Sequence, residues 1–90
     1  MGFYDKMRRR AEDSFLVQDL SAGLPRVSVT GNTRAMIENH QGIQQYCEEE
    51  VRIKCGRLIV KIIGVDLEIE ELELDELVVA GQIVSIEYLT

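Results

Sequence analysis

The chain has 90 residues, of which 46% are apolar, and carries a net charge of −6 at neutral pH. This length provides one domain with a two-layer core and excludes a deep enclosed cleft. The acidic balance repels a phosphate backbone, so nucleic acid is not an expected partner. No apolar run is long enough for a membrane span and no secretory signal is visible, so we expect a soluble, cytoplasmic protein.

Residues 1–20 have the pattern of a short amphipathic helix, because apolar residues recur at every fourth position. Two interpretations remain open: a helix that packs on the domain or frays, or a basic segment that recruits a partner or contacts a membrane. The four acidic residues of this segment cancel its four basic residues, which weakens the membrane interpretation. The candidate recruitment face consists of Phe3, Met7, Arg8, Arg9, Arg10 and Phe15, with Ala11 at the same spacing.

Residues 21–90 have the pattern of a separate β-domain, with alternating Val, Ile and Leu residues. Pro25 comes just before the first strand, where proline is tolerated, and Gly31 begins a turn. We expect a small all-β fold of about seven or eight short antiparallel strands, forming a sandwich or a curled sheet or roll, preceded by the short helix. The expected strands lie at 27–30, 34–38, 43–47, 51–55, 58–63, 67–74, 77–80 and 83–89.

Three of these strands have further predictable features. In residues 51–55 the odd positions are apolar and the even positions basic, which predicts a half-buried strand, whereas Ile59 and Ile63 predict burial on both faces of the next strand. The pair Glu70-Glu71 interrupts the alternation and predicts a bulge, a bend or a turn. The seven carboxylates of residues 66–76 alternate with leucines, so we interpret them as a solvated face that discourages edge pairing, and not as a calcium loop.

The segment IENHQGI contains the only histidine. Asn and Gly both tolerate a left-handed backbone, so this segment is expected to form a turn between two strands. The candidate turn or partner-contact residues are Glu38, Asn39, His40, Gly42 and Tyr46. No nucleophile motif, phosphate loop or zinc spacing accompanies them, so we expect no enzyme activity, no cofactor and no metal. The two cysteines are expected to be reduced and buried.

Four segments together resemble the YabP/YqfC family of sporulation proteins, most closely its YqfC branch: LPRVSVTGN, IENHQGI with Tyr46 after it, VRIKCGRLIVKI and ELVVAGQIVSIEYL. The similarity runs from about Leu24 to Leu89. Before the first strand the family commonly has a further Leu-Pro and an Asp, where this chain has QDLSAG. The resemblance implies a β-rich protein without known chemistry, made in the mother cell of endospore-forming bacteria. It also implies a multi-pass membrane sporulation protein, encoded nearby, as partner.

These observations predict a non-enzymatic sporulation protein that acts as an interaction module on the mother-cell side, in the cytoplasm or at the membrane. Weak peripheral membrane contact and homo-oligomerisation remain open. One alternative is a self-assembling structural component of the spore envelope. Another is a small-ligand binder that uses the turn formed by Glu38, Asn39 and His40.

Overall fold

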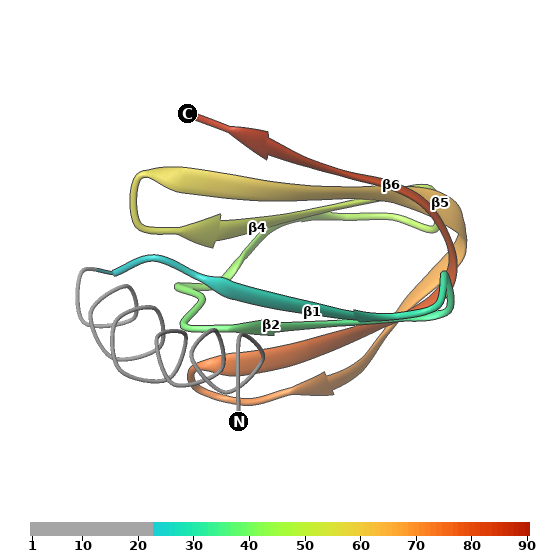
Figure 1. The fold of residues 1–90 in the computed structure, drawn as a ribbon, viewed down its shortest axis with the longest axis horizontal. Helices are drawn as coiled ribbons and strands as arrows, with labels where there is room; N and C mark the ends of the chain where they lie inside the picture. The colour runs from blue at the N-terminus through green and yellow to red at the C-terminus, as the bar shows by residue number, and fades with distance from the viewer. Residues whose placement is uncertain (1–22) are drawn as a thin grey trace, which may run out of the picture.

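The computed structural model describes residues 23–90, which form six antiparallel strands in one open sheet (Figure 1). The strands are β1 (Arg26–Thr30), β2 (Arg34–Glu38), β3 (Ile43–Tyr46), β4 (Glu50–Cys55), β5 (Leu58–Leu72) and β6 (Glu76–Leu89). Their order across the sheet is β1-β2-β6-β5-β4-β3. The predicted all-β class is confirmed, whereas the helix expected over residues 1–20 lies outside the described residues.

The number of strands in this part of the chain is six, so the expected seven or eight is not confirmed. The difference arises because β5 and β6 each combine two of the expected strands. Gly64 and Gly81 lie within these strands, where we expected them to separate one strand from the next. The pairing of β5 with β6 continues through this region, with register shifts between Ile63 and Gly64 and between Val65 and Glu68.

The long strands β5 and β6 bend sharply, as seen on the right of Figure 1. One half of the folded sheet contains β3, β4, the start of β5 and the end of β6, and the other half contains β1, β2 and the remaining parts of the long strands. The sheet therefore curls over itself, so that one face of each half is turned toward the other. Of the architectures expected from the sequence, a sandwich or a curled sheet or roll, the structure is therefore the curled sheet.

The bend is stabilised by the turns at that end of the molecule. The N–H groups of Gly64 and Leu67 donate to the carbonyls of Glu49 and Glu48, at 3.0 and 2.8 Å. These carbonyls belong to the β3–β4 turn. In the same way, the N–H groups at the bend of β6 donate to carbonyls of the β1–β2 turn, namely Gly81 to Thr33 at 3.1 Å and Ile83 to Asn32 at 2.7 Å. The two bends thus keep their backbone groups hydrogen-bonded although the ladder is interrupted.

The core lies between the two halves of the curled sheet. Its fully buried side chains come from β2, β4, β5 and β6, and the largest are Ile37, Val51, Ile53, Cys55, Val60, Ile62, Leu67, Leu77 and Val79. The odd positions of β4 all point into it, as its alternation predicts, whereas Ile59 and Ile63 of β5 are only partly buried. Within residues 23–90, no helix has the length and apolar character needed to cross a membrane.

The acidic part of β5 lies at an edge of the sheet. Within the described part of the chain, residues 68–72 pair with β6 alone. The register shifts between Ile69 and Glu71, so Glu70 is the extra residue of a bulge. The expected interruption at Glu70-Glu71 is therefore a bulge. Because carboxylates follow this edge, a second strand that carries acidic residues is repelled there.

The two cysteines lie in different environments, and both are free thiols. Cys55 has no exposed surface and contributes to the core. Cys47 is exposed, because it follows the end of β3 in the turn to β4. The expectation of two buried cysteines is thus correct for Cys55 and wrong for Cys47.

We expect a thiol reagent to label Cys47 in the folded protein and Cys55 only after unfolding. Burial raises the pKa of the Cys55 thiol from 9.0 to about 11, because it disfavours the thiolate. The unfolded state therefore loses this proton at a lower pH than the folded state, so the stability linked to Cys55 is complete below pH 9 and declines as pH rises through 11. Urea unfolding across this range, compared with Cys55→Val, measures the effect. Rapid labelling of Cys55 in the native state would contradict its burial.

Candidate functional site

The segment between β2 and β3 carries the chain from one half of the curled sheet to the other. Asn39 and Gly42 have positive φ angles of 66° and 122°. The Asn39 N–H donates to the Asp75 carbonyl at 2.6 Å, and the Gln41 N–H donates to the Lys54 carbonyl at 2.7 Å. The segment is thus hydrogen-bonded to the β5–β6 turn on one side and to β4 on the other.

His40 is the one buried polar residue of the described chain, with 8% of its surface exposed. Its Nδ1 accepts a hydrogen bond from the Gly42 N–H at 3.0 Å, and its Nε2 lies 2.9 Å from the Glu73 carbonyl. A carbonyl only accepts, so Nε2 carries a proton. Nδ1 accepts a hydrogen bond, so it carries none, and the ring is the Nε2–H tautomer. Both nitrogens are therefore engaged with the backbone, and neither is left for proton transfer or metal binding. The ring instead holds the turn to the end of β5.

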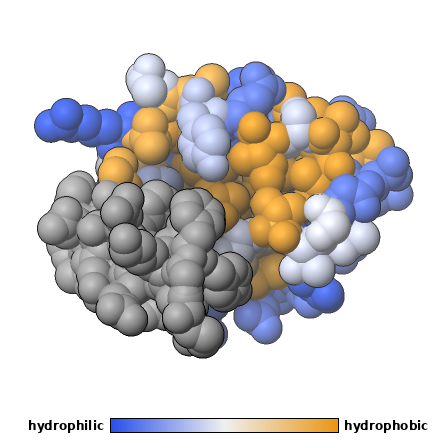
Figure 2. All heavy atoms as spheres, in the orientation of Figure 1, coloured by the Kyte–Doolittle hydropathy of each residue, from blue (hydrophilic) through white to orange (hydrophobic). Residues whose placement is uncertain are grey.

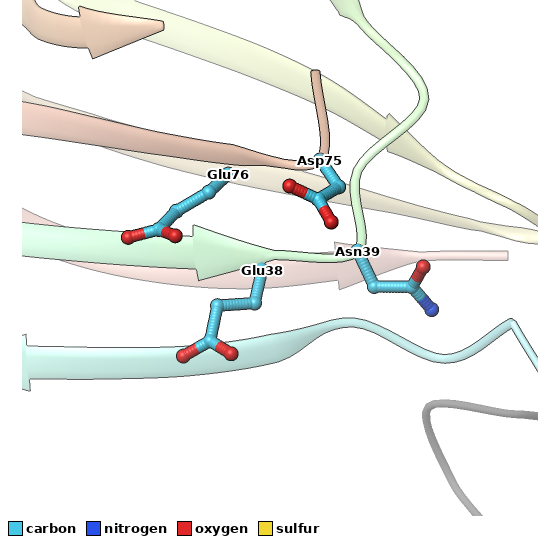
Figure 3. A pocket seen from close by; sticks show the side chains of 4 residues that line it. All are labelled: Glu38, Asn39, Asp75 and Glu76. Atoms are coloured by element: carbon cyan, nitrogen blue, oxygen red, sulfur yellow. The ribbon is translucent and has the colours of Figure 1, made fainter. Parts of the chain in front are cut away.

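Glu38 and Asn39 line an open hollow of about 230 Å³ together with Asp75 and Glu76. In Figure 3 the side chains of Glu38 and Glu76 extend in the same general direction, whereas the Asn39 amide points away from them. That amide donates to the Leu24 carbonyl at 3.0 Å. No group of three or more His, Cys, Asp or Glu residues within positions 23–90 is arranged to hold a metal ion. The three carboxylates make this hollow attractive to cationic groups.

Tyr46 lies away from this hollow, because β3 begins near the turn and ends near the bend. Its side chain is 49% exposed, and its hydroxyl makes only a long hydrogen bond, of 3.4 Å, to the Leu67 carbonyl. It lines a second hollow with Glu48, Asp66, Leu67 and Glu68. The structure therefore brings Glu38 and Asn39 together, turns His40 into the protein and separates Tyr46 from all three. The other predicted site residues, Phe3, Met7, Arg8, Arg9, Arg10 and Phe15, lie outside the described residues.

We expect Gly42→Val to lower the free energy of unfolding by roughly 1–3 kcal/mol. No heavy atom lies within 4 Å of a Cβ placed at Gly42, so the cost arises from its φ angle of 122° and not from a clash. Urea unfolding measures the change. Gln41→Val in the same turn is the matched control and should have a smaller effect, so equal losses would contradict this explanation.

A surface that the sequence pattern does not reveal lies on the inner face of the sheet, between β1 and the end of β6. Residues that pair directly across two antiparallel strands share a face. Val27 and Val29 of β1 pair with the buried Ile37 and Ala35, and Ile86 and Tyr88 of β6 pair with the buried Ile62 and Val60. We call Val27, Val29, Ile86 and Tyr88 the β1–β6 apolar face.

Much of the β1–β6 apolar face is open to solvent, although it continues the core. Val29 is 47% exposed and Tyr88 is 55% exposed. No Cα atom of β1 lies within 8 Å of one in β6, so the two strands do not close the sheet into a barrel. Figure 2 shows apolar side chains gathered across this side of the molecule. Alternation in the sequence indicates which residues face inward. It does not indicate that, within residues 23–90, β1 and the end of β6 each have a neighbouring strand on one side only.

Comparison with known proteins gives a single assignment. The model of the YabP family matches residues 22–90, which is the whole of the described β-domain. The chain belongs to the YabP family. No curated protein and no solved structure matches it significantly. Membership of this family fits a role related to sporulation, as expected from the resemblance, and the match covers both the turn around His40 and the β1–β6 apolar face.

Proposed function

We propose that this YabP-family protein, as a member of the YqfC branch, is a non-enzymatic interaction module. In this proposal it binds a multi-pass membrane protein of sporulation on the mother-cell side. The observation that carries the proposal is the β1–β6 apolar face. A contiguous apolar surface on a small domain commonly marks an interaction site.

The chemistry of this face favours binding over catalysis. Burying an aliphatic or aromatic side chain completely contributes roughly 1.5–3 kcal/mol, so covering the exposed halves of Val29 and Tyr88 contributes roughly half of that for each. The acidic hollow lies near the start of β1, where Arg26 pairs with Glu38. Glu38 follows the buried Ile37, so its side chain faces the opposite side of the sheet from Val27 and Val29. A partner segment that presents apolar side chains therefore matches the β1–β6 apolar face.

Of the two alternatives, the small-ligand binder is less favoured, because Tyr46 and His40 do not converge with Glu38 and Asn39. Self-assembly is favoured by one observation: the middle residues of the edge strand β1, Val27, Ser28 and Val29, carry no charge. A protein that pairs with its own copies through such an edge can also serve as an interaction module, so the two roles are compatible.

The test uses Tyr88→Lys in the full chain, because this change places a charge on the β1–β6 apolar face at a site that is already half exposed. Leu74→Lys is the matched control, since Leu74 is 96% exposed in the β5–β6 turn. Tagged proteins are captured from sporulating cells, and the multi-pass membrane protein encoded nearby is quantified. We expect Tyr88→Lys to lose this partner at least tenfold and Leu74→Lys to retain it. Equal recovery with both variants would refute the proposed site, and no recovery with the unaltered protein would refute the partner.

A further inference from the structure

The free edges of the sheet differ in charge. Residues 68–72 of β5, at one edge, carry three carboxylates, which repel another acidic strand. Among residues 23–90, β1 lies at an end of the strand order and pairs with β2 alone. Its sequence is RVSVT, with Arg26 as its single charge, at the first position. β1 therefore lacks the charge protection that the acidic edge has.

The backbone of β1 has hydrogen-bonding groups directed away from β2. The Thr30 carbonyl faces the β2 side of β1, because it accepts from the Thr33 N–H of the β1–β2 turn at 3.1 Å. Residues along an antiparallel strand alternate between the two sides, and the β1–β2 register is regular from Arg26 to Thr30. Thr30 and Ser28 thus direct their peptide groups toward β2. The N–H and C=O groups of Val27 and Val29 then lie in the plane of the sheet and point away from β2.

The sequence of β1 is also complementary to itself. When RVSVT is laid antiparallel on a second RVSVT with Ser28 at the centre, each Val27 lies opposite Val29 of the other copy and each Arg26 lies opposite Thr30. No two charges face each other in this register. The outward peptide groups of Val27 and Val29 also match, because two residues of a hydrogen-bonded antiparallel pair exchange both of their hydrogen bonds.

We propose that two copies of this chain pair through β1, antiparallel and about a two-fold axis at Ser28. The pairing joins the two sheets into one and places Val27 and Val29 of both copies side by side on the inner face. The interface is isologous, as in most homodimers. Because only five residues of each strand take part, the contact is small and the association is weak. The proposal does not depend on the membrane partner, since it concerns the protein alone in solution.

The first experiment uses a disulfide to detect the register. Ser28 and its copy form a non-hydrogen-bonded pair in this arrangement, with a Cα separation of about 4.5 Å, which a disulfide spans. Ser28→Cys is made in a Cys47→Ser background, which removes the exposed native thiol, and the full chain is oxidised mildly. We expect a covalent dimer. Thr30→Cys in the same background is the control, because the two copies of residue 30 lie about 13 Å apart along the strand in this register.

The second experiment measures association without a cross-link. Ser28→Asp places two carboxylates directly opposite each other, which destabilises a cross-strand pair. Sedimentation equilibrium of the unaltered chain should show a reversible dimer, and Ser28→Asp should raise its dissociation constant at least tenfold. Val84→Asp, at an exposed site on β6, should leave the dissociation constant unchanged. A monomer at every concentration, or equal cross-linking of the Ser28→Cys and Thr30→Cys variants, would overturn the proposal.

Discussion

Gly64→Ala is expected to lower the free energy of unfolding by at least about 3 kcal/mol, the upper part of the range for overpacked sites. A Cβ at Gly64 would lie 2.1 Å from the Gln82 carbonyl oxygen and 2.8 Å from Cδ2 of Leu67. The first is a backbone atom of the neighbouring long strand and the second belongs to a fully buried side chain. Neither can withdraw without opening the bend of the sheet. Such a loss is a large part of the stability of a 90-residue domain.

The control for this variant is Gly31→Ala in the β1–β2 turn. No heavy atom lies within 4 Å of a Cβ at Gly31, so only its φ angle of 53° opposes the change. The expected cost of placing a side chain in this conformation is roughly 1–2 kcal/mol. Urea unfolding monitored by circular dichroism compares the two variants. If Gly64→Ala is as stable as Gly31→Ala, the close packing at the bend does not limit the fold.

His40→Ala is expected to lower the free energy of unfolding by roughly 2–4 kcal/mol, since it leaves two partly buried backbone groups without a partner. These groups are the Gly42 N–H and the Glu73 carbonyl. The turn would then lose its side-chain connection to the end of β5. The effect is on stability and reaches partner binding only through the shape of the turn.

His40→Asn separates the two hydrogen bonds of the ring. The Asn side-chain oxygen can take the place of Nδ1 as acceptor for the Gly42 N–H, but the side chain is too short to reach the Glu73 carbonyl. We therefore expect an intermediate loss of stability, roughly half of that for His40→Ala. Nitrogen NMR of the unaltered protein should show a protonated Nε2 and an unprotonated Nδ1 at neutral pH. The opposite tautomer, or equal stability of the two variants, would contradict this arrangement.

The local elements of this protein follow from short-range sequence signals. Pro25, Gly31 and Gly56 mark the ends of strands, and the alternation of Val51, Ile53 and Cys55 correctly predicts which side of β4 is buried. The doubled glutamate at 70–71 breaks the alternation by one position, and the structure has a bulge there. These features depend on φ preferences and on the two-residue period of a strand, which neighbouring residues determine.

The candidate site was only partly predictable. The segment around His40 was expected to turn, since Asn39 and Gly42 tolerate positive φ, but the partners of the ring lie elsewhere in the sequence. Glu73 and Asp75 belong to the acidic run that we interpreted as a solvated face. Tyr46 was placed with the turn because it is near in sequence, yet each residue of an extended strand advances the chain by about 3.3 Å. β3 thus carries it toward the bend.

The sequence by itself determined the all-β class, the approximate positions of the first four strands and the inward or outward direction of most side chains, because each depends on residues a few positions apart. The tertiary structure decided that Gly64 and Gly81 lie at bends within continuous strands. Their close contacts come from Gln82 for Gly64 and from Asp66 for Gly81, residues on the opposite long strand. It also decided that β1 and the end of β6 remain open to solvent. Exposure of this kind depends on which strands become neighbours, a long-range outcome that alternation within a single strand does not encode.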